Sequence, residues 1–252
     1  MANRCQKDLE VCSKEYIPDK PSIGEENKVS KFEGEVKRII QVLDLKWAPI
    51  AGKFSDSPSE SGDRERKLKV CEAFDIVRRE NIVVSFSREN CVCPGGRHFI
   101  GLEFLPPEAI ASVLVSKGHK VYESMNVALD SVRKQPQPVS RGSFFVLGPL
   151  ERFEVDPDLV FLFVNPAQAD RILGLASFRG AEPLTYHAAS SICSTITNTL
   201  AKGKPEINFI SAFERQGSKW SPNELIIALP FKAFKTAVES IPVSGFGMAQ
   251  TS

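Results

Sequence analysis

Short apolar segments that alternate with segments of helical periodicity most constrain the fold of this chain. The clearest apolar segment, residues 159–164, has the length of a strand and is far shorter than the roughly 20 residues of a membrane-spanning helix. Residues 31–45, in contrast, place Val36, Ile39 and Ile40 at helical spacing. The alternation predicts an α/β protein, with α+β as the alternative.

The same pattern predicts strands and helices along most of the chain. Polar segments rich in Pro, Gly and Ser separate them, as in the loop at residues 55–66. We expect strands at 47–54, 82–86, 143–150, 159–164, 183–187, 207–210 and 224–230, and helices at 31–45, 67–80, 108–115, 121–134, 167–178 and 231–240. Two further helices are expected, one from Arg97 towards Phe104 and one that follows Cys193 and ends at about Leu200.

The order of predicted elements occurs twice, in residues 31–156 and in residues 157–241. In the first copy the strand 82–86 precedes Cys91 and Cys93, and in the second the strand 183–187 precedes Cys193. The closing strands, at 145–150 and 226–231, also resemble each other. We therefore predict two similar αβ halves, related by a pseudo-twofold axis and packed as one unit. A polar N-terminal extension (1–30) and a C-terminal tail (242–252) flank them.

Charge and composition exclude some classes of function. Among 252 residues, 32 basic and 31 acidic side chains give a net charge of +1, so no global field attracts nucleic acid or a membrane surface. The first 20 residues contain no apolar core of a secretory signal, which indicates a cytoplasmic protein. Disulfides are disfavoured in that compartment, so six cysteines point to metal or redox chemistry, or to packing in the core.

The most informative local motif is the segment Asn90-Cys91-Val92-Cys93-Pro94-Gly95-Gly96. It follows a predicted strand, and α/β proteins place their sites at strand ends. Its two glycines allow the backbone to approach a bound group closely. If the halves are related by a twofold axis, this loop and the loop of Cys193 could meet near the axis.

The chain also resembles the family known as domain of unknown function 169, the uncharacterised ArCR proteins. The resemblance covers about residues 44–240 and implies the fold and the importance of Cys71, Cys93 and Cys193, but no reaction. That family is widespread in archaea and anaerobic bacteria. The matching segments are Ala48-Pro49-Ile50-Ala51-Gly52-Lys53-Phe54, Cys71, Cys93-Pro94-Gly95-Gly96, Gly148-Pro149-Leu150, Asp156-Pro157-Asp158-Leu159-Val160, Asn165-Pro166-Ala167-Gln168, Cys193 and Gly203-Lys204-Pro205.

We expect the thiols to hold a metal centre, and an iron–sulfur cluster is the leading hypothesis. Cys71, Cys93 and Cys193 are the expected ligands and Cys91 a fourth candidate, since thiolates are the usual ligands of such clusters. Three thiolates would leave one iron open to a small molecule. This hypothesis places the protein in the redox or cofactor metabolism of anaerobes, with a small-molecule or redox partner. Homo-oligomerisation stays open.

Two other functions and one structural alternative remain open. Cys93 could be a nucleophile, with His187 or His98 as the base. Alternatively, the chain could be a binding module without chemistry, and Cys71 and Cys193 could be small core residues. Candidate anion-binding residues are Lys53, Gly95, Gly96, Arg97 and Gln168. Cys5 and Cys12 receive no role.

Overall fold

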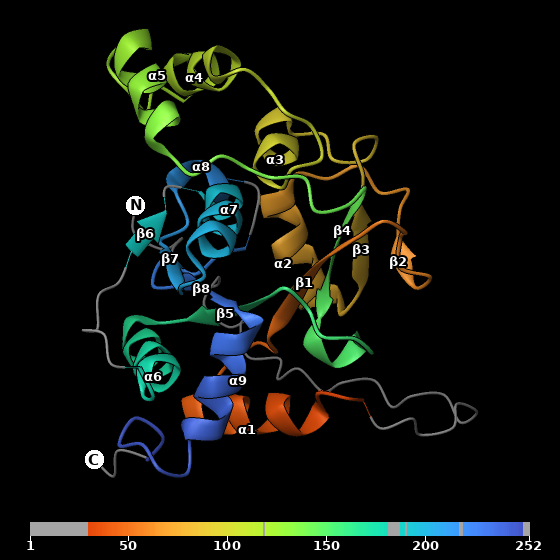
Figure 1. The fold of residues 1–252 in the computed structure, drawn as a ribbon, viewed down its shortest axis with the longest axis vertical. Coiled ribbons are helices and arrows are strands. Elements are labelled where there is room, and N and C mark those ends of the chain that lie inside the picture. Colours follow the sequence, from red (N-terminus) through yellow and green to blue (C-terminus); the bar gives the residue numbers. More distant parts are fainter. Residues whose placement is uncertain (1–29, 118, 181–186, 190, 217–218, 249–252) are drawn as a thin grey trace, which may run out of the picture.

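The computed structural model describes residues 30–117, 119–180, 187–189, 191–216 and 219–248 (Figure 1). Their helices are α1 (Glu33–Leu43), α2 (Val70–Glu80), α3 (Pro94–Phe99), α4 (Pro107–Val115), α5 (Met125–Lys134), α6 (Pro166–Ser177), α7 (Ile192–Lys202), α8 (Ala212–Arg215) and α9 (Phe231–Ser240), with a 3-10 turn at Leu150–Arg152. Their strands are β1 (Ile50–Ser55), β2 (Gly62–Asp63), β3 (Val83–Phe86), β4 (Phe144–Pro149), β5 (Leu159–Val164), β6 (His187–Ala189), β7 (Glu206–Asn208) and β8 (Leu225–Pro230). Within these ranges no helix is long and apolar enough to cross a membrane.

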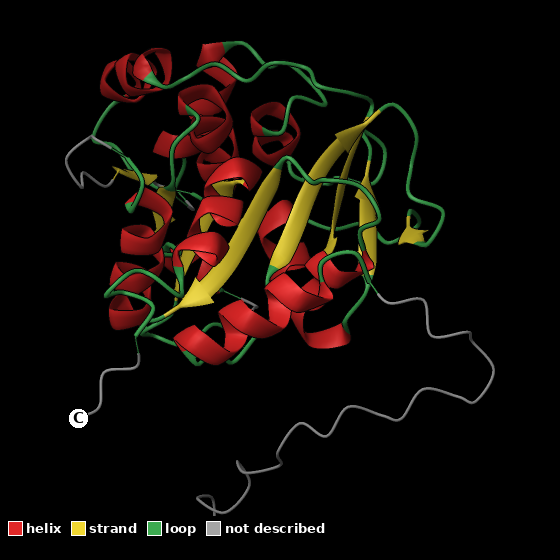
Figure 2. Cartoon of the chain, turned by 60° about the horizontal axis from the view of Figure 1, so that its bottom comes forward, coloured by secondary structure: helices red, strands yellow, loops and turns green. Residues whose placement is uncertain are grey.

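The strands of the described ranges form one mixed sheet in the order β2-β3-β4-β1-β5-β8-β7-β6. Figure 2 draws these strands in yellow among the surrounding helices. The outermost pairs on both sides, β2–β3 and β6–β7, are parallel, and the other neighbours are antiparallel. The fold is therefore mixed α/β, as the sequence predicts.

The sheet consists of two halves with the same topology, which meet where β1 pairs with β5. The first half reads β1-β4-β3-β2 outward from this junction, and the second reads β5-β8-β7-β6. In both halves a helix joins the two parallel strands, α2 in the first and α7 in the second. The predicted pseudo-twofold relation is thus present, but the predicted alignment is wrong in one respect. The counterpart of β3 is β7 and not β6, so Cys193 corresponds to Cys71 rather than to Cys93.

Helices cover both faces of the sheet, because alternate side chains of the central strands point to opposite sides. In β5, Val160, Leu162 and Val164 pack in a core with α1, α6 and α9. Leu159, Phe161 and Phe163 pack in a second core with α2 and α7. Three of the four described cysteines, Cys71, Cys91 and Cys193, belong to or pack against this second core. Helices α4 and α5 form a smaller cluster of their own beyond α3 and α8 (Figure 1).

Local capping chemistry explains why α3 differs from the predicted helix, and some other element predictions also differ from the structure. Helix α3 begins at Pro94 and ends at Phe99, rather than running from Arg97 towards Phe104, because Cys93 caps its start and Gly101 takes a positive φ of 75° after its end. The predicted loop at 55–66 contains β2, and α8 lies between the predicted strands 207–210 and 224–230, where no helix is predicted. Most of the predicted strand 183–187 and of the extension 1–30, with Cys5 and Cys12, lies outside the described residues, as does the end of the tail. The divisions at 156 and 241 stay predictions.

The buried guanidinium of Arg78, on α2, connects the two halves. It lies 4.8, 5.0 and 4.1 Å from the rings of Trp47, Phe163 and Trp220. It also pairs with Asp75 at 2.9 Å and with Glu224 at 2.6 Å. The side chain is 1% exposed, so these interactions are little screened by solvent.

Arg78→Ala should destabilise the protein by about 3–5 kcal/mol, because Asp75 would keep a buried charge without its main partner. Arg79→Ala is the matched control. Arg79 pairs with the same carboxylate but is 32% exposed, so its loss should cost below about 1 kcal/mol. Urea unfolding of both variants measures the difference, and equal costs would contradict this account of Arg78.

Candidate thiol site

Cys71 and Cys193 occupy equivalent positions in the two halves of the fold. Each is the second residue of an 11-residue helix, Cys71 in α2 and Cys193 in α7. The two helices pack against each other in the same core. The first turn of a helix carries free backbone N–H groups and a partial positive charge, which favour thiolate over thiol.

The loop of Cys91 and Cys93 is held beside the start of α2 by backbone hydrogen bonds. The Leu68 N–H donates to the Asn90 carbonyl oxygen at 3.1 Å, and the Val92 N–H donates to the Leu68 carbonyl oxygen at 3.0 Å. Close packing then brings α3 against α2. A Cβ atom at Gly96 would lie only 3.2 Å from a methyl group of Val70 and 3.4 Å from the Cys91 Sγ. Gly96 therefore suits this close approach, whereas a Cβ atom at Gly95 would meet only the Cys93 Sγ, at 3.9 Å.

Cys93 is the N-cap of α3, and its Sγ accepts a hydrogen bond from the Gly96 N–H at 3.4 Å. Helix α3 contacts α7 as well, through a hydrogen bond from the Thr197 hydroxyl to the Phe99 carbonyl oxygen. Thiols from three distant segments therefore lie in one region. Figure 1 shows α3, the starts of α2 and α7, and α8 at the end of the molecule that carries α4 and α5.

The thiols interact electrostatically in a buried environment. Burial, followed by the charges of Glu214, Cys93 and Glu72, raises the pKa of Cys71 to about 12. Burial raises the pKa of Cys91 to about 11. Burial, followed by Cys71 and Cys93, raises the pKa of Cys193 well above its usual range. Without a bound cation, these three groups are neutral thiols at pH 7.

Glu214 also belongs to this region, although its sequence context does not indicate a site. Glu214 lies on the short helix α8 and is only 8% exposed. Its Oε1 accepts a hydrogen bond from the Ile192 N–H at 2.6 Å, directly before Cys193. Its Oε2 accepts from the Ser211 N–H and Oγ, both at 2.9 Å. The only sequence signal was the Ser-x-x-Glu pattern of a capping box, which indicates a helix start and not a site.

A strained turn places α8. Ile210 has a φ of 53°, a left-handed conformation that is costly for a β-branched residue. Its N–H donates to Asn208 Oδ1 at 2.7 Å, and its carbonyl oxygen accepts from Arg215 at 2.8 Å. These bonds hold the turn that directs Glu214 towards the start of α7.

The side chains are not arranged around a single metal ion. In the described ranges, no group of three or more His, Cys, Asp or Glu side chains has an arrangement that could hold one. The donor set itself is thiolate-rich, as expected for an iron–sulfur cluster. Such a cluster places several iron and sulfide atoms between its ligands, so its ligands stand further apart than those of one ion.

Neither candidate base contacts a thiol in the described part of the chain. His98 is buried, and burial lowers its pKa, so its ring is neutral at pH 7. Its Nδ1 accepts a hydrogen bond from the Leu105 N–H at 3.1 Å. The ring proton therefore resides on Nε2, and no lone pair is left to take a proton from Cys93. His187 is exposed on β6.

The candidate anion-binding residues do not converge. Arg97 is held by Glu103 at 2.6 Å and by the Cys91 carbonyl oxygen at 2.9 Å. Lys53 lies on β1 and is 4.0 Å from Asp158. Gln168 lies in the first turn of α6, on the opposite face of the sheet from the cysteines. It accepts a hydrogen bond from the Asn165 N–H and donates to the carbonyl oxygens of Leu43 and Asp44. Gly95 and Gly96 alone remain with Arg97 at the thiol loop.

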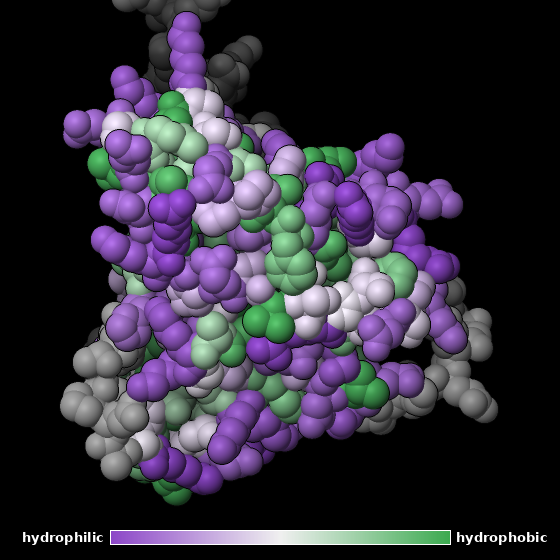
Figure 3. All heavy atoms as spheres, turned by 45° about the horizontal axis from the view of Figure 1, so that its top comes forward, coloured by the Kyte–Doolittle hydropathy of each residue, from purple (hydrophilic) through white to green (hydrophobic). Residues whose placement is uncertain are grey.

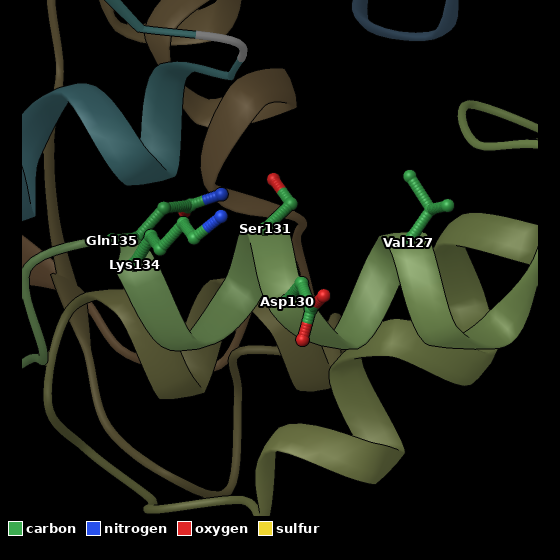
Figure 4. Close-up of a pocket in the computed structure, with 5 residues that line it drawn as sticks. All are labelled: Val127, Asp130, Ser131, Lys134 and Gln135. Atoms are coloured by element: carbon green, nitrogen blue, oxygen red, sulfur yellow. The ribbon is translucent and has the colours of Figure 1, made fainter.

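A hollow of about 540 Å³ lies along α5 and not at the thiols (Figure 4). Within the described residues its lining comes from this one helix, and Asp130 points away from the side to which Ser131 and Lys134 project. We assign no function to this hollow. On the face that Figure 3 shows, hydrophobic side chains are interspersed with hydrophilic ones.

Comparison with known proteins identifies the family. The model of the Uncharacterised ArCR family, domain of unknown function 169, matches residues 38–240, and the chain belongs to this family. An uncharacterised protein of Methanocaldococcus jannaschii is 21% identical over 223 residues, which cover 84% of this chain and 94% of that protein. No solved structure matches the chain.

In the metal-free protein, Cys93 should react with iodoacetamide before the other described thiols, by more than about tenfold at about pH 8. Cys91 and Cys193 are buried, and the raised pKa of Cys71 leaves almost no thiolate there. A Cys5→Ser/Cys12→Ser background simplifies peptide mapping by mass spectrometry. Equal rates at Cys71 and Cys93 would contradict this description.

The metal-free protein should lose stability as the pH rises above about 9. The pKa of Cys71 is 9.0 ordinarily and about 12 in the fold, so the folded state holds this proton more tightly. Its contribution is fully present below pH 9 and is lost as the pH rises towards 12. Urea midpoints of wild type and Cys71→Ala should therefore converge between about pH 8 and about pH 10.5. A constant difference between them would refute this origin.

Proposed function

We propose that this protein binds an iron–sulfur cluster on the thiolates of Cys71, Cys93 and Cys193. We further propose that it serves redox or cofactor metabolism in the cytoplasm of anaerobes. The observation that carries the proposal is the meeting of three thiols from segments that are far apart in the sequence, each within the first turn or at the cap of a helix. Thiols packed only as core residues would have no reason to share this placement in both halves of the fold.

The electrostatics of the region support a positively charged occupant. Burial and mutual repulsion keep the thiols protonated, whereas a cluster binds thiolates. Iron can replace the thiol protons, and the N–H groups at the helix starts and at Gly96 would compensate the charge on sulfur. Cys91 is a further candidate ligand, because its Sγ lies beside Gly96.

A thiol enzyme with Cys93 as nucleophile is the second candidate. Its support is that Cys93 is half-buried, unlike Cys91 and Cys193, and that its Sγ already accepts a backbone N–H. This function would require a base other than His98, whose free nitrogen carries the proton. A colourless, metal-free protein whose reactivity depends on Cys93 would favour it.

Anaerobic purification of the full chain should give a coloured protein with equal amounts of iron and acid-labile sulfide. Cys93→Ser should lose most of the iron, because one of three thiolate ligands is gone. Cys5→Ser/Cys12→Ser is the control and should keep the iron, since both residues lie outside the family match at 38–240. Iron and sulfide analysis with a visible spectrum measures this. A wild-type protein that stays iron-free after reconstitution with ferrous iron and sulfide would refute the proposal.

A further inference from the structure

We propose that Glu214, and not Cys91, is the fourth protein ligand of the centre held by Cys71, Cys93 and Cys193. This inference rests on the proposed function and completes its ligand set. Three thiolates leave one iron of a four-iron cluster without a protein ligand, and Glu214 carries a carboxylate to the same region from the second half of the fold.

The pseudo-twofold relation makes the short helix that carries Glu214 the topological counterpart of the one that Cys93 caps. Helix α3 follows β3 in the first half, and α8 follows β7, the counterpart of β3, in the second half. Each half thus contributes one donor from the second residue of a long helix, Cys71 or Cys193. Each also contributes one donor from the short helical segment after its third strand. In the first half this donor is Cys93, and in the second half it is Glu214.

The carboxylate of Glu214 is buried and oriented by its hydrogen bonds. The Ile192 N–H at 2.6 Å connects it to the residue before Cys193, and Ser211 holds its other oxygen. An ionised carboxylate has about four lone-pair positions, and three hydrogen bonds leave about one for a metal. After burial, the charge of Glu214 contributes most to the raised pKa of Cys71, ahead of the charge of Cys93.

Cys91 has a structural role that accounts for its burial. It is fully buried, pairs by a backbone bridge with Leu68, and directs its Sγ towards the Cys93 carbonyl oxygen at 3.9 Å. Its Sγ also fills the space beside Gly96. After burial, the pKa of Cys193 is raised by the charges of Cys71, Cys93 and Glu214, and the charge of Cys91 contributes less than any of these three.

The binding step is a ligand exchange without a change of oxidation state. One carboxylate oxygen of Glu214 would donate an electron pair to iron in place of a water ligand, and any proton on the carboxyl group would pass to solvent. Carboxylates are harder ligands than thiolates, so this iron should exchange more readily than the other three.

Three variants of the full chain, reconstituted anaerobically with ferrous iron and sulfide, test the inference. Glu214→Gln should lose one iron, about a quarter of the content, and give a three-iron electron paramagnetic resonance signal after mild oxidation. Glu214→Cys should restore the iron through a thiolate. Cys91→Ser, the matched control, should keep the wild-type iron content and spectrum. Circular dichroism checks that each variant folds.

The outcomes separate this inference from the proposed function. If wild type and Glu214→Gln give identical iron content and spectra while Cys91→Ser loses an iron, the fourth ligand is Cys91 and the inference is wrong, although the cluster stands. If Glu214→Gln does not fold, failure of the folded Glu214→Cys variant to hold a four-iron cluster overturns the inference. If wild type binds no iron, both proposals fall together.

Discussion

The antiparallel pairing of β1 with β5 is the constraint on which the rest of the structure depends. In this pairing Ile50 of β1 lies opposite Phe161 of β5, and the two halves are joined at the middle of the sheet. It thereby places α2 and α7 on one face, in one core, with their first turns at the same end. Arg78 reinforces the junction from within that core. The thiol region is a consequence of this pairing, because Cys71 and Cys193 belong to different halves.

Burying several ionisable groups together has an energetic cost that a structural role alone does not explain. Burial raises the pKa of Cys71, Cys193 and Glu214, and the charges of Glu214 and Cys93 add to the rise at both thiols. Natural folds retain such groups where a cation neutralises them or where chemistry needs them. The backbone N–H groups at the helix starts face the same region and would stabilise negative charge on sulfur. The arrangement therefore suits a cationic centre with anionic ligands.

Much of the fold could be predicted from the sequence, because apolar runs such as 159–164 carry a strong periodic signal. The thiols Cys71, Cys93 and Cys193 were also identifiable as a set. Sequence spacing could not show which cysteines are equivalent in the two halves. Cys193 follows the strand predicted at 183–187 much as Cys93 follows the strand at 82–86. Its structural counterpart is nevertheless Cys71. Glu214 was missed because the turn at Ile210 and the approach to Ile192 depend on tertiary contacts. Lys53 and Gln168, in contrast, were predicted to bind a ligand, but in the structure Lys53 lies near Asp158 and Gln168 donates to the Leu43 carbonyl oxygen.

Diffraction from crystals of the anaerobically purified protein, recorded at the iron absorption edge, tests the central claim most directly. The account predicts a strong anomalous peak enclosed by the sulfur atoms of Cys71, Cys93 and Cys193, at the end of the molecule that carries α3 and α8. A well-ordered thiol region without such a peak, in protein prepared with iron and sulfide, would contradict it.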